Sequence, residues 1–101
     1  MYIYNVTVSI DPDIADEWLE WMQKEHIPEV LQTGKFTGYG MLKILSTEEE
    51  EGITYSIQYK YSNPEDYERY KNDHAPTLQK KASDRFGGKF VAFRTLLQIV
   101  S

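Results

Sequence analysis

His26-Ile27-Pro28 returns later in the same chain as His74-Ala75-Pro76, and it is one of several matches that occur in the same order in both halves of the chain. Gly34-Lys35-Phe36 likewise returns as Gly88-Lys89-Phe90, and an apolar stretch typical of a strand follows each copy. Two further pairs keep the same order along the chain: Ile10-Asp11-Pro12 with Ser62-Asn63-Pro64, and Trp18-x-x-Trp21 with Tyr67-x-x-Tyr70. Ordered matches with small drifts in spacing indicate a duplicated unit. We therefore expect one domain over residues 1–101, built from duplicated halves at 1–46 and 53–101.

The first half is predicted to form a strand, a helix and a second strand. Residues 2–10 alternate between apolar and polar side chains, which is the period of a strand with one buried face. Asp11 is a favourable N-cap, and Pro12 suits the first helical position. An apolar stripe at helical spacing follows until Pro28 bends or restarts the helix and Gly34 ends it.

The second half repeats this pattern. A strand is predicted over residues 54–61, a helix begins at Asn63-Pro64, and Gly87-Gly88 end it. The last strand covers residues 90–100. Between the halves, the run from Thr47 to Gly52 contains four glutamates and is predicted to be a solvated hairpin loop.

The resulting order of elements predicts an α+β, ferredoxin-like βαββαβ fold. With right-handed crossovers, the strands form an antiparallel sheet in the order 4-1-3-2 and both helices cover one of its faces. The second strand of this order is expected over Tyr39 to Leu45. The other face of the sheet must then meet water or a partner.

The uncovered face suggests how the chain assembles. The central strands contribute mostly polar side chains to it: Ile3, Asn5, Thr7, Ser9, Thr54, Ser56, Gln58 and Lys60. The last strand contributes one of two sets, depending on its register: Phe90, Ala92, Arg94, Leu96 and Gln98, or Val91, Phe93, Leu97 and Ile99. Because this strand is apolar in both phases, we expect it to be buried on both sides in a homodimer that packs sheet against sheet. A monomer with a polar outer face is the alternative.

Composition excludes several classes of protein. The chain has no cysteine, which rules out a disulfide framework or a thiolate metal site and favours the cytoplasm. The sequence has no leader-like start and no apolar run long enough to span a membrane, so we expect neither export nor a membrane partner. A net charge of −5 argues against nucleic acid as a partner. No phosphate loop, dinucleotide fingerprint or zinc motif is present, and we predict no cofactor and no resident metal.

The repeated motifs carry a family resemblance. A duplicated unit with Trp18-x-x-Trp21 before His26-x-Pro28, and Tyr67-x-x-Tyr70 before His74-x-Pro76, resembles the dimeric α+β barrel superfamily over essentially the whole chain. The segment His74-Ala75-Pro76 looks like one found in its ethyl-tert-butyl-ether-degradation-type branch. The chain as a whole is similar to a small uncharacterised family of that superfamily, known as a domain of unknown function.

This resemblance implies a fold and an assembly. It implies a homodimer whose two sheets form a barrel, with a small-molecule cavity between the sheet and the helices of each subunit. The superfamily contains cofactor-free monooxygenases, haem-degrading enzymes, muconolactone isomerases and proteins with no known reaction. The resemblance does not choose among these activities.

The two histidines are the first candidates for catalytic residues. His26 and His74 are the only side chains that change charge near neutral pH without a perturbed environment. On straight antiparallel helices they lie at similar heights, so with Glu25, Glu29 or Asp73 they form a hypothetical two-histidine, one-carboxylate metal site. The alternative is structural, with each imidazole donating to a carbonyl freed by the following proline.

The aromatic residues are candidates for a ligand site. The helical stripes and the inner strand positions place a layer of flat rings between sheet and helices, which suits a planar hydrophobic or aromatic ligand. Our predicted ligand-binding residues are Trp18, Trp21, Tyr55, Tyr59, Tyr67, Tyr70 and Arg94. The rings equally suit a packed core. Arg94 interrupts an apolar strand and is expected to be a buried charge that pairs across the dimer or meets a ligand anion.

Three functions remain open from the sequence. The first is a homodimeric small-molecule-binding module with no assignable reaction. The second is a cofactor-independent monooxygenase or isomerase that acts on a hydrophobic aromatic molecule, with His26 or His74 as the proton acceptor. The third is a structural or interaction subunit.

Overall fold

The computed structural model describes residues 1–46, 48 and 51–101. The elements are β1 (Tyr2–Ile10), η1 (Pro12–Ile14), α1 (Ala15–Trp21), η2 (Met22–His26), α2 (Ile27–Gln32), β2 (Gly38–Lys43), β3 (Ile53–Tyr61), α3 (Pro64–Asp73), α4 (Ala75–Phe86) and β4 (Phe90–Gln98). The predicted hairpin loop from Thr47 to Gly52 lies partly outside the described residues. Within the described part of the chain, no helix has the length and apolar character needed to cross a membrane.

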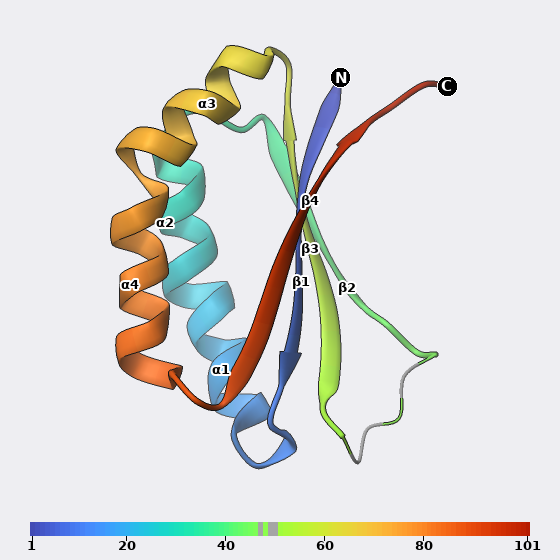
Figure 1. The fold of residues 1–101 in the computed structure, drawn as a ribbon, viewed down its shortest axis with the longest axis vertical. Helices are drawn as coiled ribbons and strands as arrows, with labels where there is room; N and C mark the ends of the chain where they lie inside the picture. The colour runs from blue at the N-terminus through green and yellow to red at the C-terminus, as the bar shows by residue number, and fades with distance from the viewer. Residues whose placement is uncertain (47, 49–50) are drawn as a thin grey trace.

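The four strands form one antiparallel sheet in the order β2-β3-β1-β4. Figure 1 shows the helical segments together on one face of this twisted sheet, with the other face left uncovered. The predicted ferredoxin-like topology is therefore confirmed. Two strands end earlier than predicted, β2 at Lys43 rather than Leu45 and β4 at Gln98 rather than Val100.

The strand register decides which side chains face the helices. Val6 pairs with Ile57 of β3 and with Arg94 of β4, so these three side chains share one face. The alternate residues of β4, including Val91 and Phe93, therefore lie on the uncovered face. The register thus selects the second of the two sets that the sequence left open.

The first helical segment contains a π turn. Asp11 accepts a hydrogen bond from the Asp13 N–H at 2.9 Å, as predicted for the N-cap. Further along, the N–H of Ile27 donates to the carbonyl of Met22, five residues back. Pro28 has no N–H, and a proline ring crowds the carbonyl four residues before it, which explains a widened turn at this point. The helix continues through Pro28 in this altered form.

The second helical segment is broken at His74, where φ is −123°. α3 ends at Asp73 and α4 begins at Ala75, with Pro76 in its first turn, where a missing N–H is harmless. The prediction of one continuous helix was therefore wrong. Asn63 occupies the N-cap position of α3, but its side chain makes no capping hydrogen bond.

The core lies between the sheet and the helices. Ile10, at the end of β1, and Ile57, in the middle of β3, are completely buried in it. Above them, the ring of Tyr4 lies 5.1–6.0 Å from a cluster of four other aromatic rings: Phe36, Tyr59, Tyr67 and Tyr70. This confirms the predicted inward orientation of Tyr59, and it places the rings where they can serve both packing and binding.

Candidate functional site

A small cavity of about 50 Å³ lies between the inner face of the sheet and the helices. Every strand except β2 contributes to its wall, together with the helical segments from α1 onward. The lining residues are Tyr4, Val6, Val8, Trp18, Trp21, Met22, His26, Val30, Ile57, Tyr59, Tyr70, Gln79, Ala82, Phe90, Ala92 and Arg94. Of these, Arg94 alone is exposed, so the mouth of the cavity lies at this side chain on β4. The space suffices for a few water molecules.

The structure brings together five of the seven predicted ligand-binding residues. Trp18, Trp21, Tyr59, Tyr70 and Arg94 all line the cavity.

The other two predicted residues contact residues that line the cavity. The ring of Tyr55 lies 5.3 Å from that of Trp18, and the ring of Tyr67 lies 5.1 Å from that of Tyr4. Both therefore support rings that line the cavity and do not line it themselves.

His26 closes the π turn and faces the cavity. Its imidazole stacks on the Trp21 indole, with ring centroids 4.9 Å apart and planes at 27°. Burial lowers the pKa of His26 to about 4, Glu29 opposes this shift, and the charges of Arg94 and Lys81 add to it. The ring is therefore neutral at pH 7 and can accept a proton or a hydrogen bond at one nitrogen.

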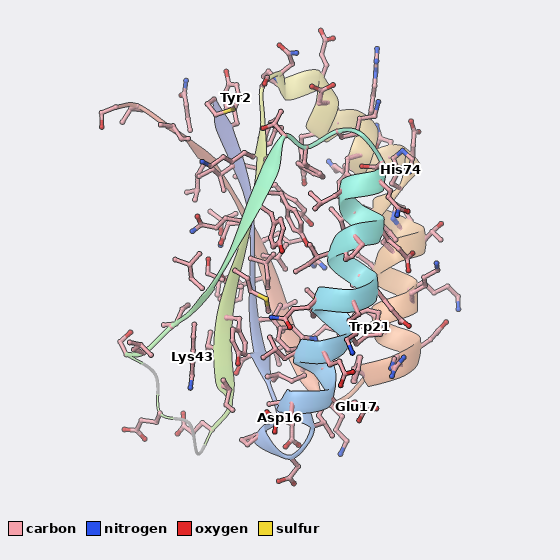
Figure 2. The ribbon with its side chains drawn as sticks, turned by 180° about the vertical axis from the view of Figure 1, so that it is seen from behind. Tyr2, Asp16, Glu17, Trp21, Lys43 and His74 are labelled. Carbon is pink, nitrogen blue, oxygen red and sulfur yellow. The ribbon has the colours of Figure 1, made fainter. Side chains whose placement is uncertain are left out.

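His74 lies elsewhere. It stands at the break between α3 and α4 and lines a separate open hollow together with Glu29, Thr33 and Asp73. Figure 2 shows His74 and Trp21 at well-separated levels of the helix layer. The two histidines therefore line different hollows, His26 at the π turn facing the inner cavity and His74 at the helix break lining the open one.

The described residues form neither of the two arrangements that we considered for the histidines. Among the described residues, which include both histidines with Glu25, Glu29 and Asp73, no three potential ligands gather into a group that could hold a metal ion. The proposed two-histidine, one-carboxylate site is therefore not formed. Neither imidazole donates to a carbonyl of a described residue, so the structural role that we considered is not formed either.

Arg94 lies on the helix-facing side of the sheet and is exposed in the single chain. It therefore points away from the uncovered face. Its burial and its pairing in a dimer stay predictions. Its Nε donates to the hydroxyl of Tyr4 at 3.1 Å.

The tyrosines of the cavity are hydrogen-bond donors. Burial raises the pKa of Tyr59 and of Tyr70 well above the ordinary value of 10.0. Burial also raises the pKa of Tyr4, and the charge and hydrogen bond of Arg94 oppose that shift. All three phenols are protonated at neutral pH. The cavity therefore offers phenol groups, one neutral imidazole, one guanidinium and the Gln79 amide, with no carboxylate in its wall.

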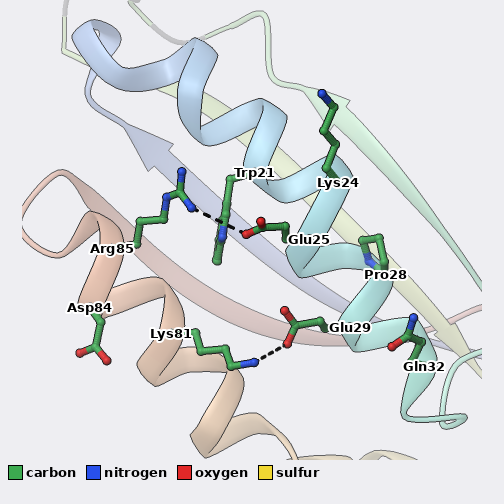
Figure 3. A pocket seen from close by; sticks show the side chains of 9 residues that line it. All are labelled: Trp21, Lys24, Glu25, Pro28, Glu29, Gln32, Lys81, Asp84 and Arg85. Atoms are coloured by element: carbon green, nitrogen blue, oxygen red, sulfur yellow. Dashed lines mark hydrogen bonds and ion pairs between the residues drawn. The ribbon is translucent and has the colours of Figure 1, made fainter.

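A second hollow lies on the outer side of the helix layer (Figure 3). It measures about 680 Å³, is open to solvent and runs between α4 and the segment from the π turn to α2. Charged side chains dominate its lining: Lys24, Glu25, Glu29, Lys81, Asp84 and Arg85, with Trp21, Pro28 and Gln32. The Trp21 ring belongs to both hollows and separates the outer groove from the inner cavity.

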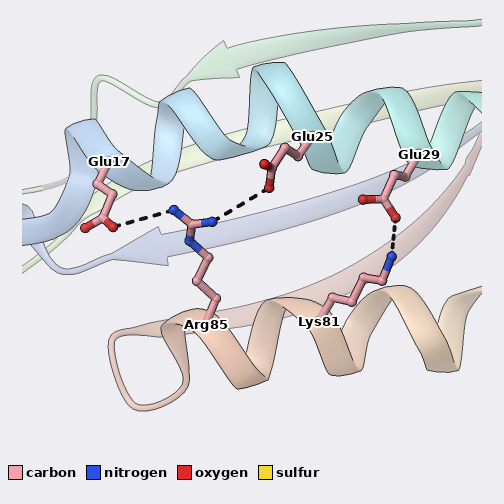
Figure 4. Close-up of polar contacts among 5 residues, drawn as sticks. All are labelled: Glu17, Glu25, Glu29, Lys81 and Arg85. Atoms are coloured by element: carbon pink, nitrogen blue, oxygen red, sulfur yellow. Dashed lines mark hydrogen bonds and ion pairs between the residues drawn. The ribbon is translucent and has the colours of Figure 1, made fainter.

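The two cations that α4 contributes to this groove are paired with carboxylates of the first helical segment (Figure 4). Arg85 lies 3.7 Å from both Glu17 and Glu25, and Lys81 lies 2.8 Å from Glu29. These contacts tie α4 to the first helical segment. Exposed pairs of this kind contribute about 0–1 kcal/mol each, and they leave no unbalanced charge to select a ligand.

Sequence reasoning missed several residues of the cavity. The alternation along β1 places Tyr4 on the inner face, and this signal was available, but nothing suggested its role as the partner of Arg94. Gln79 and Met22 line the cavity because of the way in which the helices pack on the sheet. No local pattern marks them.

The sequence of the chain matches one protein family. The family described as "Domain of unknown function (DUF4286)" matches residues 1–100. No curated protein matches the chain.

Solved structures match it closely in fold. A protein of the ethyl tert-butyl ether (EthD) family from Bacillus halodurans is 13% identical, with a TM-score of 0.68 over 94% of this chain and 97% of that one. A dimeric ferredoxin-like protein from an uncultured marine organism is 15% identical, with a TM-score of 0.67 over 100% and 96% of the two chains. A proposed antibiotic biosynthesis monooxygenase from Nitrosomonas europaea is 12% identical, with a TM-score of 0.67 over 100% of both chains. At these identities the likeness establishes the fold and nothing further.

Proposed function

We propose that this chain, which belongs to the family described as a domain of unknown function (DUF4286), binds a small, flat and largely apolar molecule between its sheet and its helices. The observation that carries this proposal is the cavity itself, where aromatic rings meet one neutral histidine and one arginine. Apolar walls with a few convergent polar groups are the usual composition of a ligand site. We further propose that the protein acts in the cytoplasm, which the lack of cysteine supports.

The cavity is too small to hold a ligand without a change in its wall. A space of about 50 Å³ is far below the roughly 300–1,000 Å³ of established ligand pockets. Binding therefore requires the wall to widen. The place for this is the mouth at Arg94, where the edge strand β4 and helix α4 meet the cavity through Ala92 and Ala82.

A second candidate function is a cofactor-independent monooxygenase or isomerase with His26 as the proton acceptor. The perturbed histidine beside a cavity favours it, because perturbed titrating groups cluster at active sites. A base with a pKa of about 4 is, however, weak at neutral pH, where a general base works best with a pKa near the pH of the medium. The binding module therefore stays the first proposal. A purely structural subunit is the third.

The uncovered sheet face supports a homodimer. Along β4, Val91 is 70% exposed and Phe93 is 60% exposed in the single chain, with Leu97 beside them. The neighbouring polar groups bond to each other, as Ser56 donates to Asn5 at 2.6 Å and Asn5 donates to Thr7 at 3.0 Å. An apolar band next to satisfied polar groups suits burial against a second copy by two-fold symmetry.

Native mass spectrometry of the purified protein tests both parts of the proposal. We expect the mass of a dimer. We also expect additional mass from a bound ligand, either one retained through purification or one bound after a small aromatic compound is added. Phe93→Asp should give monomers, because it places a charge in the apolar band. Leu45→Asp is the matched control, since Leu45 is 84% exposed but lies outside the strands, and it should stay dimeric. A wild-type monomer contradicts the dimer, and a cavity that takes up no aromatic compound contradicts the binding module.

A further inference from the structure

Arg94 is a cation set into an apolar wall. Its neighbours on the same face of β4 are Ala92 and Leu96, and across the ladder it faces Val6. The strand therefore places one guanidinium beside a cavity whose other lining residues, His26 and Gln79 apart, are apolar or aromatic. Because Arg94 is exposed in the single chain, water solvates its charge and a ligand of opposite sign can reach it.

No ion-pair partner for Arg94 lies among the described residues. The single hydrogen bond of Arg94 to a described residue runs from Nε to the Tyr4 hydroxyl at 3.1 Å, and no described carboxylate forms an ion pair with it. Arg85 provides the contrast, because it lies between Glu17 and Glu25. The Nη1 and Nη2 groups of Arg94 therefore keep their N–H donors free.

The bond to Tyr4 also orients the guanidinium. With the Nε edge held by the phenol, the edge carrying both Nη atoms is the one left for a ligand. That edge donates two parallel N–H bonds, which match the two oxygens of a carboxylate. The positive charge of Arg94 also acts on titrating groups of the cavity. Burial lowers the pKa of His26, and the charge of Arg94 lowers it further. Burial raises the pKa of Tyr4 and of Tyr70, and the charge of Arg94 opposes this rise.

We infer that the ligand of this cavity is an aromatic carboxylate, whose carboxylate is bound by Arg94 and whose ring enters the aromatic layer beside Tyr4 and Trp18. The inference rests on the proposed binding function and adds the charge and the chemical class of the ligand. The protonated phenols and the Gln79 amide suit it, because they offer donors and no competing negative charge.

Benzoate and benzamide form a matched pair of probes, since they share one ring and one shape while benzamide carries no charge. Both are titrated into the wild-type protein and followed by two-dimensional NMR at the indole N–H groups of Trp18 and Trp21 and at the Arg94 Nε–H. We expect benzoate to bind about tenfold more tightly than benzamide, the ratio that one charge-assisted contact supplies. Arg94→Gln should remove this preference and leave benzamide binding unchanged. Arg94→Lys, which keeps the charge but loses the paired donors, should restore part of it.

The outcomes separate the two proposals. If both probes bind the wild-type protein equally, or if Arg94→Gln keeps the preference for benzoate, the carboxylate inference is wrong and the binding function stands. If neither probe moves the indole signals, the binding function fails and the inference fails with it. Arg85→Gln is the control, because it removes an arginine that lies outside the cavity, and it should retain the preference for benzoate in a folded protein.

Discussion

The buried imidazole of His26 makes the stability of this protein depend on pH in a calculable way. Burial lowers the pKa of His26 from the ordinary 6.5 to about 4. In the unfolded chain the imidazole becomes protonated as the pH falls below 6.5, whereas in the folded protein it stays neutral down to about pH 4. The unfolded state therefore binds more protons in this interval. The contribution of the neutral His26 to the unfolding free energy is fully present above pH 6.5 and is lost as the pH falls towards 4.

The magnitude follows from the same two values. A pKa lowered from 6.5 to about 4 corresponds in full to about 3 kcal/mol of unfolding free energy. Between pH 7 and pH 5, the linkage relation assigns about 2 kcal/mol of lost stability to His26 alone. His26→Phe keeps a ring against Trp21 but cannot take up a proton. From pH 7 to pH 5, the unfolding free energy of His26→Phe should therefore decrease less than that of the wild type, and the difference between the two decreases should be about 2 kcal/mol.

The assay is urea unfolding at pH 7 and pH 5, followed by the fluorescence of the buried Trp18 and Trp21. Protein concentration is held constant, since dimerisation would contribute to the measured free energy. Met22→Leu is the control: it changes the same cavity wall without changing a titrating group, and its pH dependence should equal that of the wild type. The reasoning is refuted if His26→Phe and the wild type lose the same free energy, or if NMR gives His26 a pKa near 6.5.

Three further predictions concern stability. Gly87→Ala should destabilise the fold by about 1–3 kcal/mol, because an added Cβ meets the carbonyl oxygen of Ser83, whereas Gly38→Ala, with open space at its Cβ, should change the urea midpoint little. Ile57→Ala should cost about 2–5 kcal/mol in urea unfolding, since the side chain is completely buried between sheet and helices; a loss below 1 kcal/mol would mean that the core is loosely packed there. A double-mutant cycle of Lys81→Met and Glu29→Gln should give a coupling energy below about 1 kcal/mol, because both side chains are exposed; a larger value would show that this pair helps to hold α4 in place.

The sequence determined the topology of this protein. The period-two alternation in residues 2–10, the cap at Asp11 and the stops at Gly34 and Gly88 are local signals, and each acts within a few residues of itself. The order of elements that they define has one common antiparallel solution, which the structure confirms. The duplication of the two halves, read from the same repeated motifs, stays a prediction.

The tertiary structure decided which of these residues form a site. His26 and His74 stand in the same local motif, yet a π turn directs one into the cavity and a helix break leaves the other outside. The phase of β4 was equally open, because Val91 and Ala92 are both apolar, and only the pairing of β4 with β1 places Arg94 beside Tyr4. Strand register and helix packing depend on contacts between residues far apart in the chain. A local pattern therefore predicts the elements, and only their packing determines the cavity between them.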